Sequence, residues 1–345
     1  MIRLNLVLGF VFVLFSSCDR EEGIEPIGLP LVSWDVIEIG PNYFGQYWDY
    51  HFLDERQGFF LSNSLLKSED GGRNFSPITE SLNSLNLREL AVLDEDFIWI
   101  ALDSLDLVNE EVVTNFMHTR DGGENWEKWT VSNVRMDEIS FISPEKGFAF
   151  GVQFFPDQVD GKYQVFKTDD GGKTWSEVED IVVNNNLRNF VWKDSQTGYL
   201  LDWAGPQYIT YDAGETWALL PSIGEPTDIL FYAGDENLFF IYRDQQTLRI
   251  DRSTGEVQKV VDHPLLIVSH RGEEYLGILL IDGCLNPNTC IRRWVTSSDS
   301  GKTWSQKEIC PYEVGYNFSS QQLSPGKAVF PVGNLIDELI FVSKK

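Results

Sequence analysis

The sequence predicts an all-β protein in which seven similar four-stranded sheets surround one axis, a seven-bladed β-propeller. The first observation is a turn motif, Ser/Thr-x-Asp-x-Gly-x-Thr/Asn-Trp/Phe, that occurs five times in the 345 residues. Its aspartates are Asp70, Asp121, Asp170, Asp212 and Asp299, at intervals of 51, 49, 42 and 87 residues. Self-similarity at a fixed period of this size is the signature of repeat architectures.

The long fourth interval is the second observation, because it is about twice the others and predicts one degenerate repeat. The segment 250–257 fits this role, since it keeps a glycine, Gly255, and has Ser253 where the aspartate belongs. The chain therefore contains six predicted hairpins of the same kind.

The third observation is a shared segment before each motif: an apolar strand, a polar turn that ends in Gly plus an aromatic residue, and a second strand. Gly58-Phe59, Gly147-Phe148 and Gly198-Tyr199 are examples. Short strands at regular spacing with turn residues between them indicate an all-β sheet assembly. Four strands in about 45 residues are what one propeller blade requires.

The two ends of the chain predict the seventh blade. Residues 318–342 repeat the strand pattern but stop without the motif, which leaves three strands. Residues 32–39, which include Trp34, read as an unpaired fourth strand. We expect this N-terminal strand to complete the last blade and to close the ring, so that no sheet edge is exposed at the seam.

The turn chemistry of the motif is structural. The aspartate can accept hydrogen bonds from backbone N–H groups, and the glycine supplies a positive φ without steric cost. The motif resembles the Asp-box, or BNR-type, repeat of sialidase-like propellers. The order of strand, Gly-aromatic, strand and box is similar to that of the photosystem II assembly-factor-like branch of these propellers. The resemblance implies that the boxes lie away from the ligand face and carry no chemistry.

The N-terminus predicts export and lipidation. Residues 4–15 form an apolar run that is too short to span a bilayer, and Leu-Phe-Ser-Ser-Cys18 follows and resembles a bacterial lipobox. We expect residues 1–17 to be a lipoprotein signal peptide, Cys18 to carry acyl chains, 18–30 to be an acidic tether and 31–345 to be the propeller. An ordinary cleaved signal with an incidental cysteine is the alternative.

Residues 19–22, Asp-Arg-Glu-Glu, resemble the tag that exports some Gram-negative lipoproteins to the cell surface. The expected location is the outer membrane, held by the lipid anchor only. In such a compartment Cys284 and Cys290, which flank a short turn-rich loop, are expected to form a disulfide. No CxxC or HxxxH spacing occurs, so neither a metal nor a cofactor is expected.

Charge excludes one class of partner. The formal net charge of −26 repels phosphate backbones, so nucleic-acid binding is not expected. The sequence has no G-x-S-x-G motif, and its four histidines have no spacing typical of a triad. The absence of an Arg-Ile-Pro signature disfavours sialidase activity.

A ligand face is expected where loops enter the innermost strand of each blade. The residues just before these strands mix aromatic, basic and acidic types, which suits recognition of a protein or polysaccharide. The candidate binding residues are Tyr47, Trp48, Arg88, Asp137, Arg188, Asp228 and Tyr316. Segments 103–114 and 154–163 are expected to lengthen two loops on this face.

These observations predict a non-catalytic, surface-anchored propeller that binds an envelope protein or a polysaccharide. The alternative is a glycoside hydrolase or lyase that uses carboxylates of the same face, such as Asp137 and Asp228. A third interpretation, an assembly factor for an envelope complex, is implied by the family resemblance alone.

Overall fold

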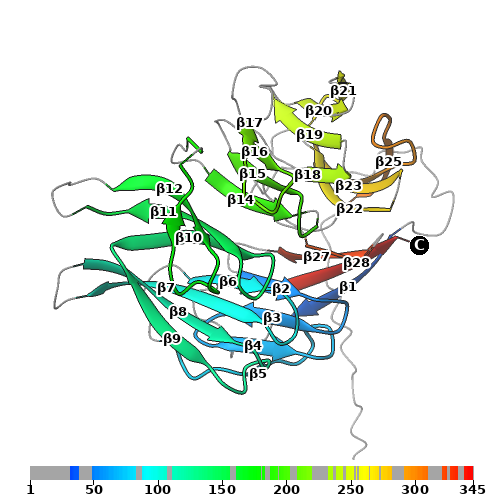
Figure 1. Ribbon diagram of the computed structural model, residues 1–345. Helices are drawn as coiled ribbons and strands as arrows, with labels where there is room; N and C mark the ends of the chain where they lie inside the picture. Colours follow the sequence, from blue (N-terminus) through cyan, green and yellow to red (C-terminus); the bar gives the residue numbers. More distant parts are fainter. Residues whose placement is uncertain are drawn as a thin grey trace, which may run out of the picture.

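Seven antiparallel sheets of four strands account for the regular secondary structure of the described residues (Figure 1). The computed structural model describes residues 32–38, 49–82, 88–106, 111–155, 161–179, 181–182, 187–192, 194–202, 208–219, 232–235, 238–243, 246–251, 254, 256–263, 265–271, 273–281, 291–309, 321–324, 327–332 and 338–344. Within these ranges no helix is long and apolar enough to cross a bilayer. The all-β prediction is therefore confirmed.

Each sheet follows the chain from its first strand outward. Sheet 1 comprises β2 (Asp49–Phe52), β3 (Gly58–Leu61), β4 (Leu65–Ser68) and β5 (Ser76–Pro77); sheet 2 comprises β6 (Arg88–Val92), β7 (Ile98–Asp106), β8 (Glu111–Thr119) and β9 (Glu127–Ser132). Sheet 3 comprises β10 (Val134–Phe141), β11 (Gly147–Gln153), β12 (Lys162–Thr168) and β13 (Ser176–Glu177); sheet 4 comprises β14 (Leu187–Trp192), β15 (Gly198–Asp202), β16 (Tyr208–Thr210) and β17 (Ala218–Leu219).

The remaining sheets repeat the pattern. Sheet 5 comprises β18 (Tyr232–Asp235), β19 (Leu238–Arg243), β20 (Gln246–Asp251) and β21 (Val257–Val261); sheet 6 comprises β22 (Leu265–Arg271), β23 (Glu274–Ile281), β24 (Ile291–Ser297) and β25 (Ser305–Ile309). Sheet 7 comprises β26 (Gln321–Ser324), β27 (Lys327–Val332), β28 (Glu338–Lys344) and β1 (Val32–Glu38). The degenerate motif predicted at 250–257 lies at the hairpin between β20 and β21.

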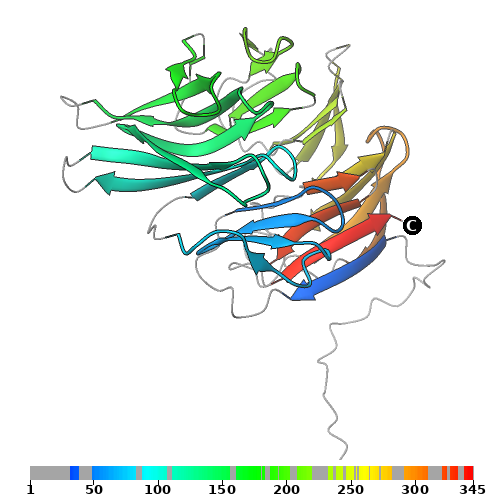
Figure 2. The same ribbon diagram turned by 60° about the horizontal axis from the view of Figure 1, so that its bottom comes forward.

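Sheet 7 joins the two ends of the described chain. Strand β1 pairs antiparallel with β28, with Trp34 opposite Val342 and Glu38 opposite Glu338. Figure 2 shows this blue strand along the edge of the red C-terminal strands. The prediction that the N-terminal segment supplies the fourth strand of this sheet is confirmed.

We call the first strand of each sheet its inner strand, and six of the seven inner strands contact the inner strand of a neighbouring sheet. Strand β6 lies against both β2 and β10, β10 contacts β14, and β26 contacts both β2 and β22. Inner strands from sheets that are distant in the sequence thus come together.

The five motif turns, which we call box turns, share one set of hydrogen bonds. In the turn of sheet 3, the Thr168 hydroxyl donates to Asp170 Oδ1 and accepts from Gly172 N, each at 2.9 Å. The backbone and side chain of Thr174 donate to the two oxygens of Asp170 at 2.9 and 2.7 Å. The other four turns repeat these bonds at 2.6–3.0 Å. The aspartates therefore close the turn, as predicted.

Each box turn is also tied to the first hairpin of its own sheet. Gly171 N donates to Glu145 O at 2.7 Å, and Ser300 N donates to Glu273 O at 2.9 Å. Box turns and first hairpins therefore lie at one end of each sheet, the box face. The second hairpins and the connections between sheets lie at the opposite end, which we call the loop face.

The box turn of sheet 3 joins this sheet to the preceding one. The Trp99 and Trp129 indoles of sheet 2 donate to the carbonyl oxygens of Gly171 and Gly172 in the box turn of sheet 3, at 3.0 and 2.7 Å. A buried cluster continues the contact between sheets 3 and 4, where Phe148 packs with residues of both sheets. The repeated motif thus acts between sheets as well as within them.

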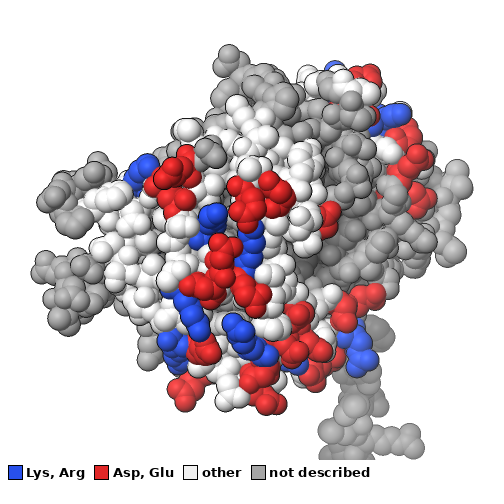
Figure 3. All heavy atoms as spheres, in the orientation of Figure 1, with Lys and Arg blue, Asp and Glu red and all other residues white. Residues whose placement is uncertain are grey.

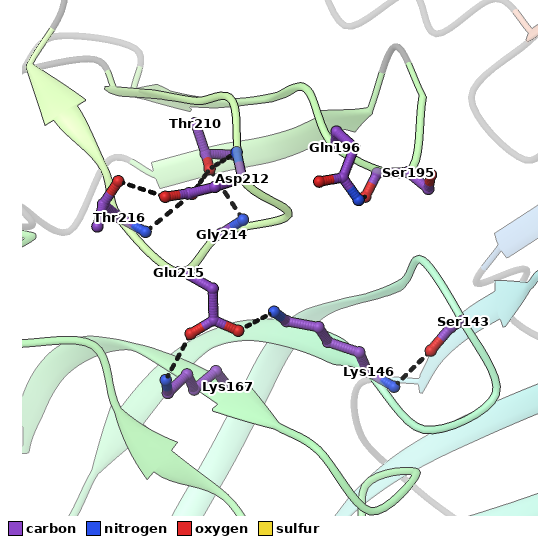
Figure 4. Close-up of polar contacts among 10 residues, drawn as sticks. All are labelled: Ser143, Lys146, Lys167, Ser195, Gln196, Thr210, Asp212, Gly214, Glu215 and Thr216. Carbon is purple, nitrogen blue, oxygen red and sulfur yellow. Dashed lines mark hydrogen bonds and ion pairs between the residues drawn. The ribbon is translucent and has the colours of Figure 1, made fainter.

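Figure 4 shows the box turn of sheet 4 against sheet 3. Glu215 of this turn bonds to Lys146 and lies 3.8 Å from the Lys167 ammonium, and both lysines belong to sheet 3. In the same turn the Thr216 hydroxyl and backbone lower the pKa of Asp212 to about 2. The carboxylate therefore remains ionised across the physiological pH range and keeps accepting these bonds.

Candidate functional site

Three of the predicted binding residues lie on neighbouring inner strands near the loop face. Arg88 opens β6, Asp137 lies in β10, and Arg188 lies in β14. The strand contacts place these positions on adjacent sheets. Several predicted residues lie outside the described residues: Cys18, Tyr47, Trp48, Asp228, Cys284, Cys290 and Tyr316.

Asp137 and Arg188 occupy the same kind of irregularity. The register of β10 against β11 shifts between Met136 and Glu138, and that of β14 against β15 shifts between Leu187 and Asn189. Each shift leaves one additional residue, Asp137 or Arg188, in an inner strand. Such bulges turn a side chain away from the regular alternation and are frequent beside functional sites.

Gly151 allows the bulge in β10. This residue pairs with Met136, and a Cβ atom at Gly151 would lie only 2.0 Å from the carbonyl oxygen of Arg135. Any larger residue would therefore push β10 away at the position where Asp137 leaves the regular strand.

The Arg135 guanidinium bonds to both oxygens of the Asp137 carboxylate. Its Nε lies 2.7 Å from Oδ1 and its Nη2 lies 3.0 Å from Oδ2. This bidentate pair raises the pKa of Arg135, and the Tyr163 hydroxyl adds to the effect. Tyr163, on β12, stacks on Phe150 with ring centroids 5.6 Å apart. A partly exposed ion pair and an aromatic ring thus lie together on sheet 3.

Three further carboxyl groups occupy equivalent positions in successive inner strands. Asp49, Glu89 and Glu138 each lie three residues before the end of their strands β2, β6 and β10. Asp49 Oδ2 accepts from Leu90 N of the next inner strand at 3.2 Å. Glu138 Oε1 accepts from Phe190 N at 2.9 Å in the same manner. Asp49 and Glu138 therefore join neighbouring inner strands.

Burial raises the pKa values of these acids, to neutral pH or above for Asp49 and Glu138. Desolvation raises the pKa of Asp49 to about 7, although hydrogen bonds from Tyr50 and Leu90 oppose the rise. Burial likewise raises the pKa of Glu138 to about 8. The pKa of Glu89 is well above its ordinary value, through burial and then the charges of Asp49 and Glu138. Neighbouring carboxyls in one low-dielectric site cannot all ionise.

Two long second hairpins project beside these residues on the loop face, β7–β8 and β11–β12 (Figure 1). The expectation that 103–114 is a long loop is wrong in part, because β7 extends to Asp106 and β8 begins at Glu111. Residue 163 likewise belongs to β12. The extra residues lengthen the strands because their backbone groups pair with each other.

Asn133 links the two hairpins close to their tips. Its N–H donates to Val112 O at 2.8 Å, and its carbonyl oxygen accepts from Phe154 N at 2.8 Å and from Gln153 Nε2 at 2.9 Å. With φ at 60°, Asn133 forms the tight connection between β9 and β10, a conformation that Asn tolerates better than most residues.

Sequence reasoning missed Arg135, Glu138 and Tyr163. Arg135 and Tyr163 are far apart in the chain, and no local pattern distinguishes them. Glu138 could have been found by aligning the repeats on the start of the second strand, at Gly58, Ile98 and Gly147, because Asp49, Glu89 and Glu138 each lie nine residues before it. In the part of the chain that the structure describes, no group of three His, Cys, Asp or Glu side chains is arranged to hold a metal ion.

The surface charge fits the composition. Figure 3 shows many Asp and Glu side chains on one face, with Lys and Arg side chains between them. The basic side chains drawn on this face form no continuous stripe that a phosphate backbone could follow.

Comparison with known proteins shows the fold. No protein-family model matches the chain, and no curated protein matches it. Among solved structures, "YCF48 bound to D1 peptide" is 17% identical with a TM-score of 0.64, covering 94% of this chain and 100% of that chain. A GH74 xyloglucanase from Xanthomonas campestris is 11% identical with a TM-score of 0.59, covering 91% of this chain and 54% of the enzyme. The WD40 β-propeller domain of Doa1 is 10% identical with a TM-score of 0.55, covering 92% and 98%. The chain has a β-propeller fold.

Proposed function

We propose that this chain is a closed, seven-bladed, Asp-box propeller that binds a protein or glycan partner through its loop face without catalysis. The pairing of β1 with β28 and the contacts between inner strands support the closed ring. The observation that carries the functional proposal is that Asp137 and Glu138, two acids at this end of sheet 3, are already engaged in the scaffold.

Asp137 and Glu138 illustrate this engagement. Both oxygens of Asp137 are held by one guanidinium, and Glu138 bonds to the backbone of the next inner strand. A glycoside hydrolase typically places two carboxyl groups on either side of the scissile bond, whereas both oxygens of Asp137 already face the Arg135 guanidinium. An ion pair beside an aromatic ring, carried on a rigid sheet, is instead typical of a recognition surface.

The partner class follows from the compared structures by analogy alone. One of them, YCF48, has a D1 peptide bound, and another is a xyloglucanase. We extend these to this chain as a peptide segment of an envelope protein or a polysaccharide. An acyl anchor at Cys18 and the acidic tether 18–30 would hold the propeller at the outer membrane, facing the cell surface.

A binding experiment tests the proposal. Tagged wild-type protein and the variants Asp137→Ala, Arg188→Ala and Trp48→Ala would be used to capture partners from an envelope extract and from a glycan array. We expect each variant to lose at least about tenfold in captured partner, as for removal of one good contact. Arg120→Ala, an exposed residue of a box turn, is the matched control and should bind normally. Unchanged capture by the loop-face variants would contradict the proposed face.

The raised pKa of Glu138 favours a second candidate, a glycoside hydrolase or lyase. A carboxyl group that stays protonated at neutral pH can serve as a general acid. Screening the purified protein on a panel of polysaccharides separates the two functions. Hydrolysis that disappears in Glu138→Gln would support the enzyme, whereas inactivity on the whole panel would support the binding protein.

A further inference from the structure

His118 of β8 is a buried histidine that the proposed binding does not use. Its side chain is 1% exposed, and its ring stacks on Trp99 with centroids 4.4 Å apart and planes 6° from parallel. The Trp129 ring meets it edge-on at 6.3 Å. Neither ring nitrogen has a hydrogen-bond partner within the described residues.

This histidine lies behind the contact between sheets 2 and 3. The two indoles that enclose it, Trp99 and Trp129, are the ones that donate to Gly171 and Gly172 of the next box turn. The position and tilt of both indoles therefore depend on how the imidazole fills the space between them. A change at His118 is transmitted directly to the hydrogen bonds that join two sheets.

The surroundings of His118 disfavour the protonated form of its imidazole ring. Burial is the main reason that its pKa falls from 6.5 to about 4. The charges of Arg120, beyond the end of β8, and of Lys173, in the box turn of sheet 3, lower the pKa further, while Glu127 on β9 raises it. Lys173 and Glu127 also form an ion pair of 3.1 Å across the two sheets.

We propose that His118 is an acid-sensitive joint, at which uptake of one proton loosens the box turn of sheet 3 from sheet 2. A protonated His118 carries two N–H donors, and the described residues around the ring offer no hydrogen-bond acceptor to either of them. Attraction between the cation and the tryptophan faces acts perpendicular to the ring and satisfies neither donor. The charged ring must move out of the aromatic layer, which displaces the two indoles.

The direction with pH follows from linkage. The folded state resists protonation and the unfolded state does not, so stability is full above pH 6.5 and falls as the pH drops toward 4. With these two pKa values, the folding equilibrium constant falls about 70-fold between pH 7.5 and 4.5 through His118. His51, whose pKa burial also lowers to about 4, adds a separate contribution that remains in His118 variants.

Urea unfolding of the full chain at pH 7.5 and 4.5 tests the size of the effect. His118→Phe preserves an aromatic ring. We expect the fall of its folding equilibrium constant between pH 7.5 and 4.5 to be about 70-fold smaller than that of the wild type. The control His263→Gln lies at a half-buried site outside the contact between sheets 2 and 3, and it should lose as much stability between pH 7.5 and 4.5 as the wild type. The same acid-induced loss in His118→Phe and the wild type would overturn the proposal.

Hydrogen exchange tests the place of the effect. Between pH 7.5 and 4.5, after correction for intrinsic rates, protection of residues 126–131 and 168–175 should fall in the wild type and stay constant in His118→Phe. Protection that falls only elsewhere would overturn the joint. A ¹³C NMR titration of histidine in the wild-type chain needs no variant, and a His118 signal that titrates near 6.5 would also refute it.

Discussion

The close approach of sheet 4 to sheet 3 at Gly214 leads to a quantitative prediction for Gly214→Ala. Gly214 has a φ of +77°, and a Cβ atom placed on it would lie 2.1 Å from Cζ of Phe148 and 2.7 Å from Cε1. Phe148 is fully buried, and its ring centroid lies 6.0 Å from that of Phe190 and 5.2 Å from that of Trp192, so the ring can move only by displacing its neighbours. One added methyl group therefore strains the backbone, which has a positive φ, and also clashes with the ring of Phe148.

The two effects have known sizes. A non-glycine residue in the left-handed region costs about 1–2 kcal/mol. Forcing an extra methyl group into a packed core costs about 1–3 kcal/mol. We expect Gly214→Ala to lower the free energy of unfolding by about 3 kcal/mol, because the backbone and the ring can share the adjustment.

The neighbouring residue provides a matched control with the opposite sign. Ala213 has a φ of 60°, whereas three other box turns have glycine at this position, with φ between 68° and 76°. Ala213→Gly relieves the left-handed strain but adds flexibility to the unfolded chain, so we expect a gain of about 0.5–1 kcal/mol.

Urea unfolding followed by tryptophan fluorescence measures both variants. The m-value should stay unchanged, because the surface exposed on unfolding is the same. A loss below about 1 kcal/mol for Gly214→Ala would refute the claim that the box turn is packed tightly on Phe148. Destabilisation by Ala213→Gly would refute the claim that Ala213 is strained.

Three other predictions follow from the ion pair, the inner-strand acids and the N-terminus. A double-mutant cycle of Lys146→Met and Glu215→Gln should give a coupling free energy of about 0.5 kcal/mol in unfolding, which 1 M NaCl should remove. A coupling free energy that does not depend on salt would contradict an exposed ion pair. Since the pKa of Glu138 is raised to about 8, the folded state loses stability as the pH rises from 4.5 to 8. In urea unfolding, the free energy of unfolding of Glu138→Gln should therefore rise relative to that of the wild type over this pH range. A constant difference between the two proteins would contradict the raised pKa. Globomycin should accumulate the unprocessed precursor if Cys18 is lipidated, and an unchanged ratio of precursor to mature protein on a gel would exclude it.

The repeated turns made the architecture predictable. Each box turn is a local structure whose residues supply their own hydrogen bonds, as the bonds from Thr168 and Thr174 to Asp170 show. Local chemistry of this kind is visible in the sequence because the partners lie within a few residues of each other. The pairing of β1 with β28 was also predictable, since the count of strands left three strands at the C-terminal end and one at the N-terminal end.

The arrangement of the loop face was less accessible. Asp137 and Arg188 were selected for their place before an inner strand, but nothing local indicated that both occupy bulges. The bulge in β10 depends on Gly151, and the Asp137 side chain is held by Arg135 beside Tyr163 of another strand. These relations join residues that are separated in the chain, so a single sequence does not reveal them.

The sequence by itself determined the number of sheets, the box turn before the last strand of five of them and the strand that completes the seventh, because periodicity and turn chemistry act over a few residues. Only the tertiary structure decided which acids are protonated, which indoles join two sheets and why His118 carries no proton. These properties depend on burial and on charges brought together from different strands, and burial is a property of the assembled sheets.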